Sequence, residues 1–136
     1  MEQLRSGAAA AEAGRLSFTE LKWSDAKGVA LVGALRVAHE RGRLQQLETL
    51  NLYANRMGDE TAAALAALLE AGAMPKLKRL LLVDNRIGKA GMAALASAVR
   101  GGALPSCEVI YLDGNPGSAA PVKKAAAQRG GMKVEG

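Results

Sequence analysis

The sequence has few of the features that stabilise an extracellular domain or anchor one in a membrane. A single cysteine, Cys107, has no partner for an internal disulfide, and no Asn-x-Ser/Thr glycosylation site occurs. No apolar run approaches the roughly 18 residues that a membrane-spanning helix needs, and charged residues interrupt the alanines near the N-terminus. We therefore expect a protein of the cytosol or the nucleus.

Residue types used in catalysis are scarce as well. His39 is the only histidine, and its neighbours lack the second histidine of a zinc-protease helix. The sequence contains no phosphate-binding loop of the G-x-x-x-x-G-K-[ST] type and no cluster with metal-ligand spacing. Cys107 occupies an apolar position of the repeat described below, so we expect a buried, unreactive thiol. We predict no catalytic residue, no cofactor and no metal, and hence no enzyme.

Aromatic residues make up only 3% of the chain although 49% of it is apolar, so the core must consist of Leu, Ala, Val and Met. The 18 Lys and Arg exceed the 13 Asp and Glu, which gives a net charge of +5. These basic residues are scattered along the chain, and scattered charge is typical of an ordinary solvated surface. Binding of nucleic acid is therefore disfavoured.

A repeated segment is the clearest positive signal. LETLNLYANRM begins at Leu47, LKRLLLVDNRI at Leu77 and CEVIYLDGNPG at Cys107, each thirty residues after the last. The first two follow the skeleton L-x-x-L-x-L-x-x-N-x-φ, where φ is apolar. The third has Cys107 and Ile110 at the first two leucine positions and Gly117 at the final apolar position. A fixed period of this size predicts a stack of structural repeats.

Within each copy the alternating leucines indicate a short strand, because side chains on a strand alternate between its two faces. A helical segment follows each inner copy. Asp59 is placed to cap the first of these helices, and Gly72 and Gly101-Gly102 are placed to end them. The expected buried positions are Ala62, Leu65, Leu68 and Leu69 in the first helix, and Met92, Leu95, Ala98 and Val99 in the second.

The first unit is more divergent. Leu16, Phe18 and Trp23 take the positions of Leu50, Leu52 and Met57, and Leu21 replaces the asparagine. Terminal repeats are expected to be atypical because only one side meets a neighbour. We therefore interpret Trp23 as a core or capping residue.

The two inner units, with their full helices, resemble leucine-rich repeats of the ribonuclease-inhibitor type. The resemblance implies an α/β solenoid of about four units, a short right-handed horseshoe with parallel strands on the concave face and helices on the convex face. The physical dimensions agree, because strands pack ~4.8 Å apart whereas helices need ~10 Å.

This resemblance divides the chain into three parts. Residues 1–12 form an N-terminal extension or partial cap, and residues 13–120 form the repeat domain. The units lie near 13–46, 47–76, 77–106 and 107–120. Residues 121–136 form either a C-terminal cap helix or a frayed tail.

Each asparagine of the skeleton can satisfy backbone groups that are freed where the strand turns. We expect Asn55, Asn85 and Asn115 to stack into a structural ladder.

The strand residues that point away from the core form a concave face, which repeat proteins commonly use to bind partners. Its predicted rows are Thr49–Arg79–Val109, Asn51–Leu81–Tyr111 and Tyr53–Val83–Asp113. Tyr and Arg are frequent interface anchors, and an exposed patch of Leu81, Val83 and Val109 would favour a partner. β-propensity alone also explains such residues, with neighbouring side chains covering the patch.

We therefore predict a non-catalytic module that binds a protein partner through these nine residues. Proteins with such repeats, as the resemblance implies, include inhibitors, GTPase activators, NOD-like receptors and actin-capping proteins of the tropomodulin kind, so the fold does not choose among them. One alternative is a GTPase-activating or other enzyme-regulatory protein. Another is an assembling fragment of a longer array, which would form homo-oligomers through an exposed sheet edge.

Overall fold

Strands and helices alternate along the whole of residues 14–136, the part of the chain that the computed structural model describes. The predicted N-terminal extension, residues 1–12, lies outside the described residues. The elements are β1 (Arg15–Ser17), α2 (Asp25–Glu40), β2 (Thr49–Asn51), α3 (Asp59–Glu70), β3 (Arg79–Leu81), α4 (Lys89–Arg100), β4 (Val109–Tyr111), α5 (Ala120–Arg129) and β5 (Lys133–Glu135).

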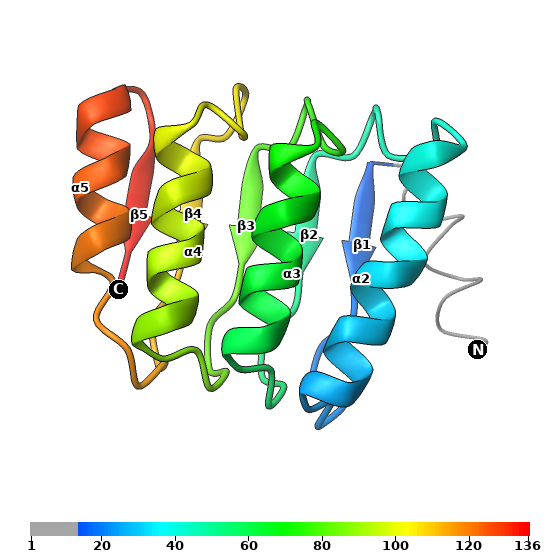
Figure 1. The fold of residues 1–136 in the computed structure, drawn as a ribbon, viewed down its shortest axis with the longest axis horizontal. Helices are drawn as coiled ribbons and strands as arrows, with labels where there is room; N and C mark the ends of the chain where they lie inside the picture. The colour runs from blue at the N-terminus through cyan, green and yellow to red at the C-terminus, as the bar shows by residue number, and fades with distance from the viewer. Residues whose placement is uncertain (1–13) are drawn as a thin grey trace.

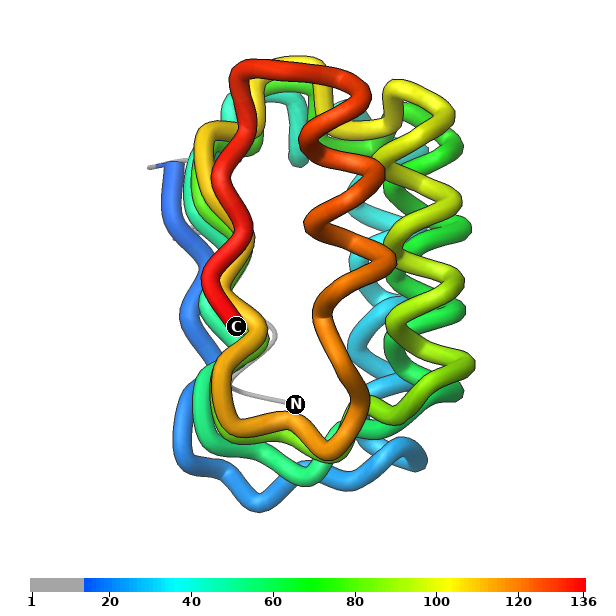
Figure 2. The backbone as a smooth tube through the Cα atoms, turned by 90° about the vertical axis from the view of Figure 1, so that its left-hand side faces the viewer, coloured from blue at the N-terminus to red at the C-terminus, as the bar shows by residue number. Residues whose placement is uncertain are grey.

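The elements form two layers (Figures 1 and 2). The strands pair in parallel in the order β1-β2-β3-β4-β5, and the helices cover one face of this sheet. The sheet stays open, with β1 and β5 at its edges among the described residues. The predicted fold class, an α/β repeat array with parallel strands in one layer and helices in the other, is confirmed.

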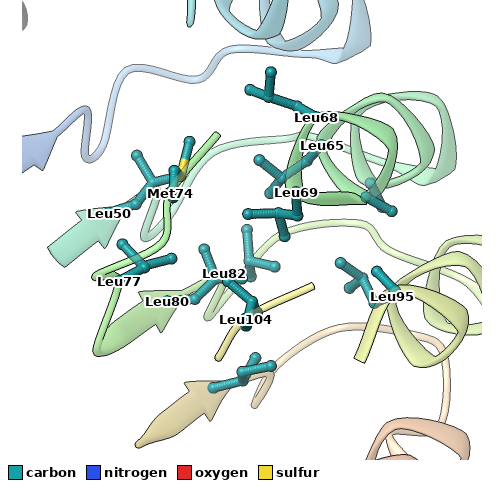
Figure 3. Close-up of a cluster of buried hydrophobic side chains, with 14 of the residues drawn as sticks. Leu50, Leu65, Leu68, Leu69, Met74, Leu77, Leu80, Leu82, Leu95 and Leu104 are labelled. Atoms are coloured by element: carbon teal, nitrogen blue, oxygen red, sulfur yellow. The ribbon is translucent and has the colours of Figure 1, made fainter. Parts of the chain in front are cut away.

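The core lies between the two layers and repeats with the units (Figure 3). Leu50 lies beside Leu80, and Leu80 pairs in turn with Ile110, so that equivalent side chains stack directly. All three side chains are at most 1% exposed. The expected inward positions of α3 and α4 are buried as well, so the helical period read from the sequence matches the packing.

Helix starts are capped by the preceding unit, which differs from the expectation for Asp59. Asp59 is the first residue of α3, but its Oδ1 accepts hydrogen bonds from the N–H groups of Gly88 (2.7 Å) and Gly91 (2.9 Å) at the start of α4. Asp25 does the same for Gly58 (2.7 Å) at the start of α3. Stacking brings each carboxylate to the next helix, whose first N–H groups lack partners within that helix.

Gly117 occupies a position where the skeleton calls for an apolar side chain, and the packing explains the exception. A Cβ atom at Gly117 would lie 2.6 Å from the carbonyl carbon of Gly88. The N–H of Gly117 donates to the carbonyl oxygen of Ile87 (2.8 Å). The chain passes so close to the previous unit that only glycine fits.

The C-terminal segment contains both a helix and a further strand. After α5, the chain returns to the sheet and β5 pairs with β4. The N–H of Leu112 donates to the carbonyl oxygen of Glu135 (2.7 Å), and that of Lys133 to Glu108 (2.9 Å). Residues 133–135 therefore cover the edge of β4 rather than fraying from it.

Candidate functional site

The concave face consists of side chains that alternate with the buried leucines of the strands. The register places Thr49 beside Arg79 and Arg79 beside Val109, and in the same way aligns Asn51, Leu81 and Tyr111. Beyond the strands the ladder continues, because the N–H of Ala54 donates to Val83 and the N–H of Asp84 donates to Asp113, at 2.9 and 2.8 Å. The nine candidate residues thus lie on one surface.

Two further strands extend this surface beyond the candidate residues. Arg15 and Ser17 of β1 pair with Thr49 and Asn51. On the other side, Lys133 and Glu135 of β5 pair with Val109 and Tyr111. The alignment of Leu16 with Leu50 in the sequence is the signal that could have placed Arg15 and Ser17 on this face. Nothing in the polar, three-residue β5 segment signalled a strand.

The apolar part of the face is less exposed than an open patch would be. Leu81, Val83 and Val109 are each half-buried, as is Tyr111. Tyr53 is 37% exposed. Neighbouring side chains therefore cover much of the aliphatic surface, and Tyr53 is the most accessible apolar side chain of the face.

The charges on the face differ between its two ends. Arg15 and Arg79 are exposed and form no ion pair with any described residue. On β5, Lys133 pairs with Glu135 at 2.9 Å, and the hydrogen bond that Lys133 donates to the Glu135 carboxylate raises the pKa of Lys133. Within residues 14–136, Arg15 and Arg79 are thus cations of this face without an ionic partner.

Asn51 differs from its neighbours because its side chain is already engaged. Its Oδ1 accepts a hydrogen bond from the N–H of Tyr53 at 3.0 Å. This contact fixes the end of β2 and leaves the amide nitrogen of Asn51 as the group that a partner could contact.

The three skeleton asparagines link each turn to the preceding unit. Asn85 Nδ2 donates to the carbonyl oxygen of Leu52 (2.9 Å), and its Oδ1 accepts from the N–H of Met57 (3.1 Å). Asn55 donates to Phe18 (2.6 Å). Asn115 donates to Leu82 at 2.8 Å in the same manner. These amides bond to backbone groups on both sides, so they hold the units together.

Trp23 and Cys107 both belong to the interior. The Trp23 ring is half-buried and stacks on Phe18, with ring centroids 5.5 Å apart. Cys107 is buried, and this burial raises the pKa of its thiol to about 11. At neutral pH the thiol therefore stays protonated, whereas a nucleophile requires the thiolate.

The described residues offer little to a small ligand or a metal. Among residues 14–136 no group of three or more His, Cys, Asp or Glu could hold a metal ion. A shallow pocket of about 260 Å³ lies between the end of β4 and the start of α5, with Asp113 and Lys123 as its charged residues. No helix in this part of the chain is long and apolar enough to cross a membrane.

Comparisons with known proteins bear on the fold. No protein-family model matches the chain, and no curated protein matches it. Among solved structures, the chain is similar to leiomodin-1 actin-binding site 2, with a TM-score of 0.71 and 16% sequence identity. The match covers 98% of this chain and 76% of the leiomodin-1 chain. At this identity the similarity establishes a shared fold.

Proposed function

We propose that the chain is a non-catalytic module that binds a protein partner through the concave strand face. The main support is that the helices cover only the opposite face of the sheet, which leaves the outward strand side chains open to contact (Figure 2). Full helices in the inner units also favour repeats of the ribonuclease-inhibitor type.

The contact would centre on three residues of the face. Tyr53 is its most exposed apolar side chain, Arg79 forms no ion pair within residues 14–136, and Tyr111 lies beside Leu81 on the adjacent strand. Tyrosine and arginine often supply most of the binding energy of a protein interface, because both offer large contact area together with hydrogen bonding.

Actin is the partner that we would test first. The shared fold with leiomodin-1 actin-binding site 2 supports this choice, and an actin partner agrees with the cytosolic location expected from the sequence. Because the two chains share only 16% identity, the contact residues are inferred from this chain's own face.

The test is cosedimentation with actin filaments together with titration of actin monomers. The variants are Tyr53→Ala and Arg79→Glu, and the matched control is Arg100→Glu, which makes the same charge change at the end of α4. We expect either concave-face variant to weaken binding by about tenfold or more, as loss of an interface anchor does.

Two results would contradict this proposal. If no form of actin binds the wild-type chain, actin is not the partner. If actin binds all variants equally, the concave face is not the contact surface.

A further inference from the structure

Three basic residues that are far apart in the sequence lie on consecutive turns of the array. Each basic residue directly precedes the last apolar position of its repeat skeleton: Lys22 precedes Trp23, Arg56 precedes Met57, and Arg86 precedes Ile87. All three basic residues are exposed. These turns follow the strands, at the lower edge of the array in Figure 1. We call Lys22, Arg56 and Arg86 the basic row.

The asparagine ladder holds the backbone of this row in place. Asn55 Oδ1 accepts hydrogen bonds from the N–H groups of Leu21 (3.2 Å) and Trp23 (3.1 Å), on either side of Lys22. In the next turns, Asn85 and Asn115 accept from the residues that follow Arg56 and Arg86. The three cations are therefore carried on a fixed backbone.

Backbone hydrogen bonds between units add to this order. The N–H of Arg56 donates to the carbonyl oxygen of Trp23, and that of Arg86 donates to Met57, both at 2.8 Å. Because buried residues flank each arginine, its side chain is directed away from the core.

No member of the basic row forms an ion pair with a described residue. The nearest acidic residues in sequence are Glu20 and Asp84, two positions before Lys22 and Arg86. The Asp84 carboxylate is turned toward the following unit, since a Cβ on Gly114 would lie 1.9 Å from its Oδ1.

Three carboxylates, Asp25, Asp59 and Glu60, stand in the first turns of α2 and α3 on this edge, and the first two of them accept hydrogen bonds. Asp25 accepts from the hydroxyl of Thr61 (2.6 Å) and from backbone N–H groups of α3. Asp59 accepts from the N–H groups at the start of α4. Both of these aspartates keep their charge, but neither forms an ion pair with a member of the basic row, so the N–H donors of its three side chains are open to a partner as far as the described residues are concerned.

We propose that Lys22, Arg56 and Arg86 bind an extended acidic polypeptide segment that runs across the repeat units. Equivalent atoms of neighbouring units lie ~4.8 Å apart in the strand layer and ~10 Å apart in the helix layer. Because these turns connect the two layers, the spacing between neighbouring members of the basic row falls in the range from ~4.8 to ~10 Å. Alternate residues of an extended peptide are ~6.8 Å apart, within this range. Carboxylates on alternate residues can thus meet one cation per unit.

The surroundings of the basic row favour a polypeptide over a nucleic acid. Single-stranded nucleic acids are bound by cations together with aromatic side chains on which bases stack. Trp23, the aromatic residue next to Lys22, is half-buried and stacked on Phe18. Phe18 therefore already occupies one face of this ring. This interaction is independent of the concave face and of the identity of its partner.

The probe is a fluorescent peptide of about twelve residues in which glutamate alternates with serine. A second peptide of identical composition carries its glutamates in one block. The double variant Arg56→Glu/Arg86→Glu is compared with Arg41→Glu/Arg100→Glu, which has the same net charge but is altered at the C-terminal ends of α2 and α4. Circular dichroism checks that both variants fold, and Arg56→Gln/Arg86→Gln replaces the first if it does not.

We expect the wild-type chain and the Arg41/Arg100 variant to bind the alternating peptide, and the basic-row variant to bind it at least about tenfold more weakly. Affinity should fall with added salt, because the contacts are exposed ion pairs. Equal loss in both double variants, or equal affinity for the two peptides, would show that net charge alone attracts the peptide and would overturn the proposal. Tighter binding of a single-stranded oligonucleotide would overturn it in favour of a nucleic acid.

Discussion

Asn85 shows how a single side chain can join two units of this array. Its amide donates to Leu52 and Leu82 and accepts from Met57, while the side chain itself is only 6% exposed. Removing the amide leaves these buried backbone groups without partners, and that loss is more costly than the loss of an exposed hydrogen bond.

We therefore predict that Asn85→Ala lowers the free energy of unfolding by roughly 1–3 kcal/mol, measured by urea denaturation. Asn51→Ala is the control, because the Asn51 side chain lies on the concave face and, within residues 14–136, bonds to its own strand end. A cost for Asn85→Ala that is no larger than the cost for Asn51→Ala would mean that the ladder contributes little.

Asp25 links stability to pH. Burial alone would raise its pKa, but hydrogen bonds from the Thr61 hydroxyl and from the N–H groups of Gly58 and Thr61 lower it below the usual value. A carboxyl whose pKa is lower in the folded state stabilises that state above its unfolded pKa, near ~3.9. The stabilisation is lost as pH falls through the folded value.

The predicted outcome is that Asp25→Ala costs about 1 kcal/mol at pH 7, the usual cost of losing a helix cap. The difference between wild type and variant should shrink as the pH falls below about 4, in urea unfolding followed at several pH values. Asp25→Asn keeps an acceptor oxygen without the charge, so it should be intermediate at pH 7. A difference that stays constant down to low pH would show that the charge of Asp25 does not matter.

At the scale of elements, helix α2 contains two glycines in opposite environments. A Cβ atom on Gly28 would lie 2.2 Å from Thr61 Oγ1 of α3, whereas a Cβ on Gly33 would have no atom within 4 Å. The first glycine allows the two helices to approach closely, while the second only adds flexibility to the unfolded chain.

This pair of sites makes a matched test of helix packing. Gly28→Ala should destabilise the protein by roughly 1–3 kcal/mol because the methyl group forces α2 and α3 apart. Gly33→Ala should stabilise it by about 0.5–1 kcal/mol, since alanine is the better helix former. Thermal unfolding by circular dichroism measures both. Similar effects of the two substitutions would be inconsistent with the close α2–α3 contact.

At the scale of the whole molecule, β5 determines which strand forms the C-terminal edge of the sheet. Without β5, β4 would lose the strand that pairs with its half-buried Val109 and Tyr111. The backbone groups of Glu108 and Leu112 would lose their hydrogen-bond partners. Unpaired strand edges with apolar side chains pair readily with other chains.

A chain that ends at Gly130 should therefore be less stable and should self-associate more strongly than the full chain. Sedimentation across a concentration series measures this association. In the control, Lys133→Ala/Glu135→Ala removes the ion pair of β5 but keeps its backbone, so its mass should match that of the full chain. Equal association of the shortened and full chains would show that β5 does not protect the edge.

Much of the architecture could be predicted because the strand and helix signals are local. Leu50 alternates with the polar Thr49 and Asn51 as a strand with one buried face requires, and the constant period brings Thr49, Arg79 and Val109 into one row. The exposure of that row was harder to predict. How far Leu81 or Val109 is covered depends on side chains from adjacent strands, and a single strand sequence does not contain that information.

The sequence by itself determined the repeating unit: a strand, an asparagine turn and a helix, recurring every thirty residues. It could do so because alternation, helix periodicity and helix-ending glycines act over a few neighbouring residues. Only the tertiary structure decided which groups of different units meet. It placed the Asp59 carboxylate on the following helix and Gly117 against Gly88. These contacts depend on how the units are offset as they stack, and no local signal in the chain specifies that offset.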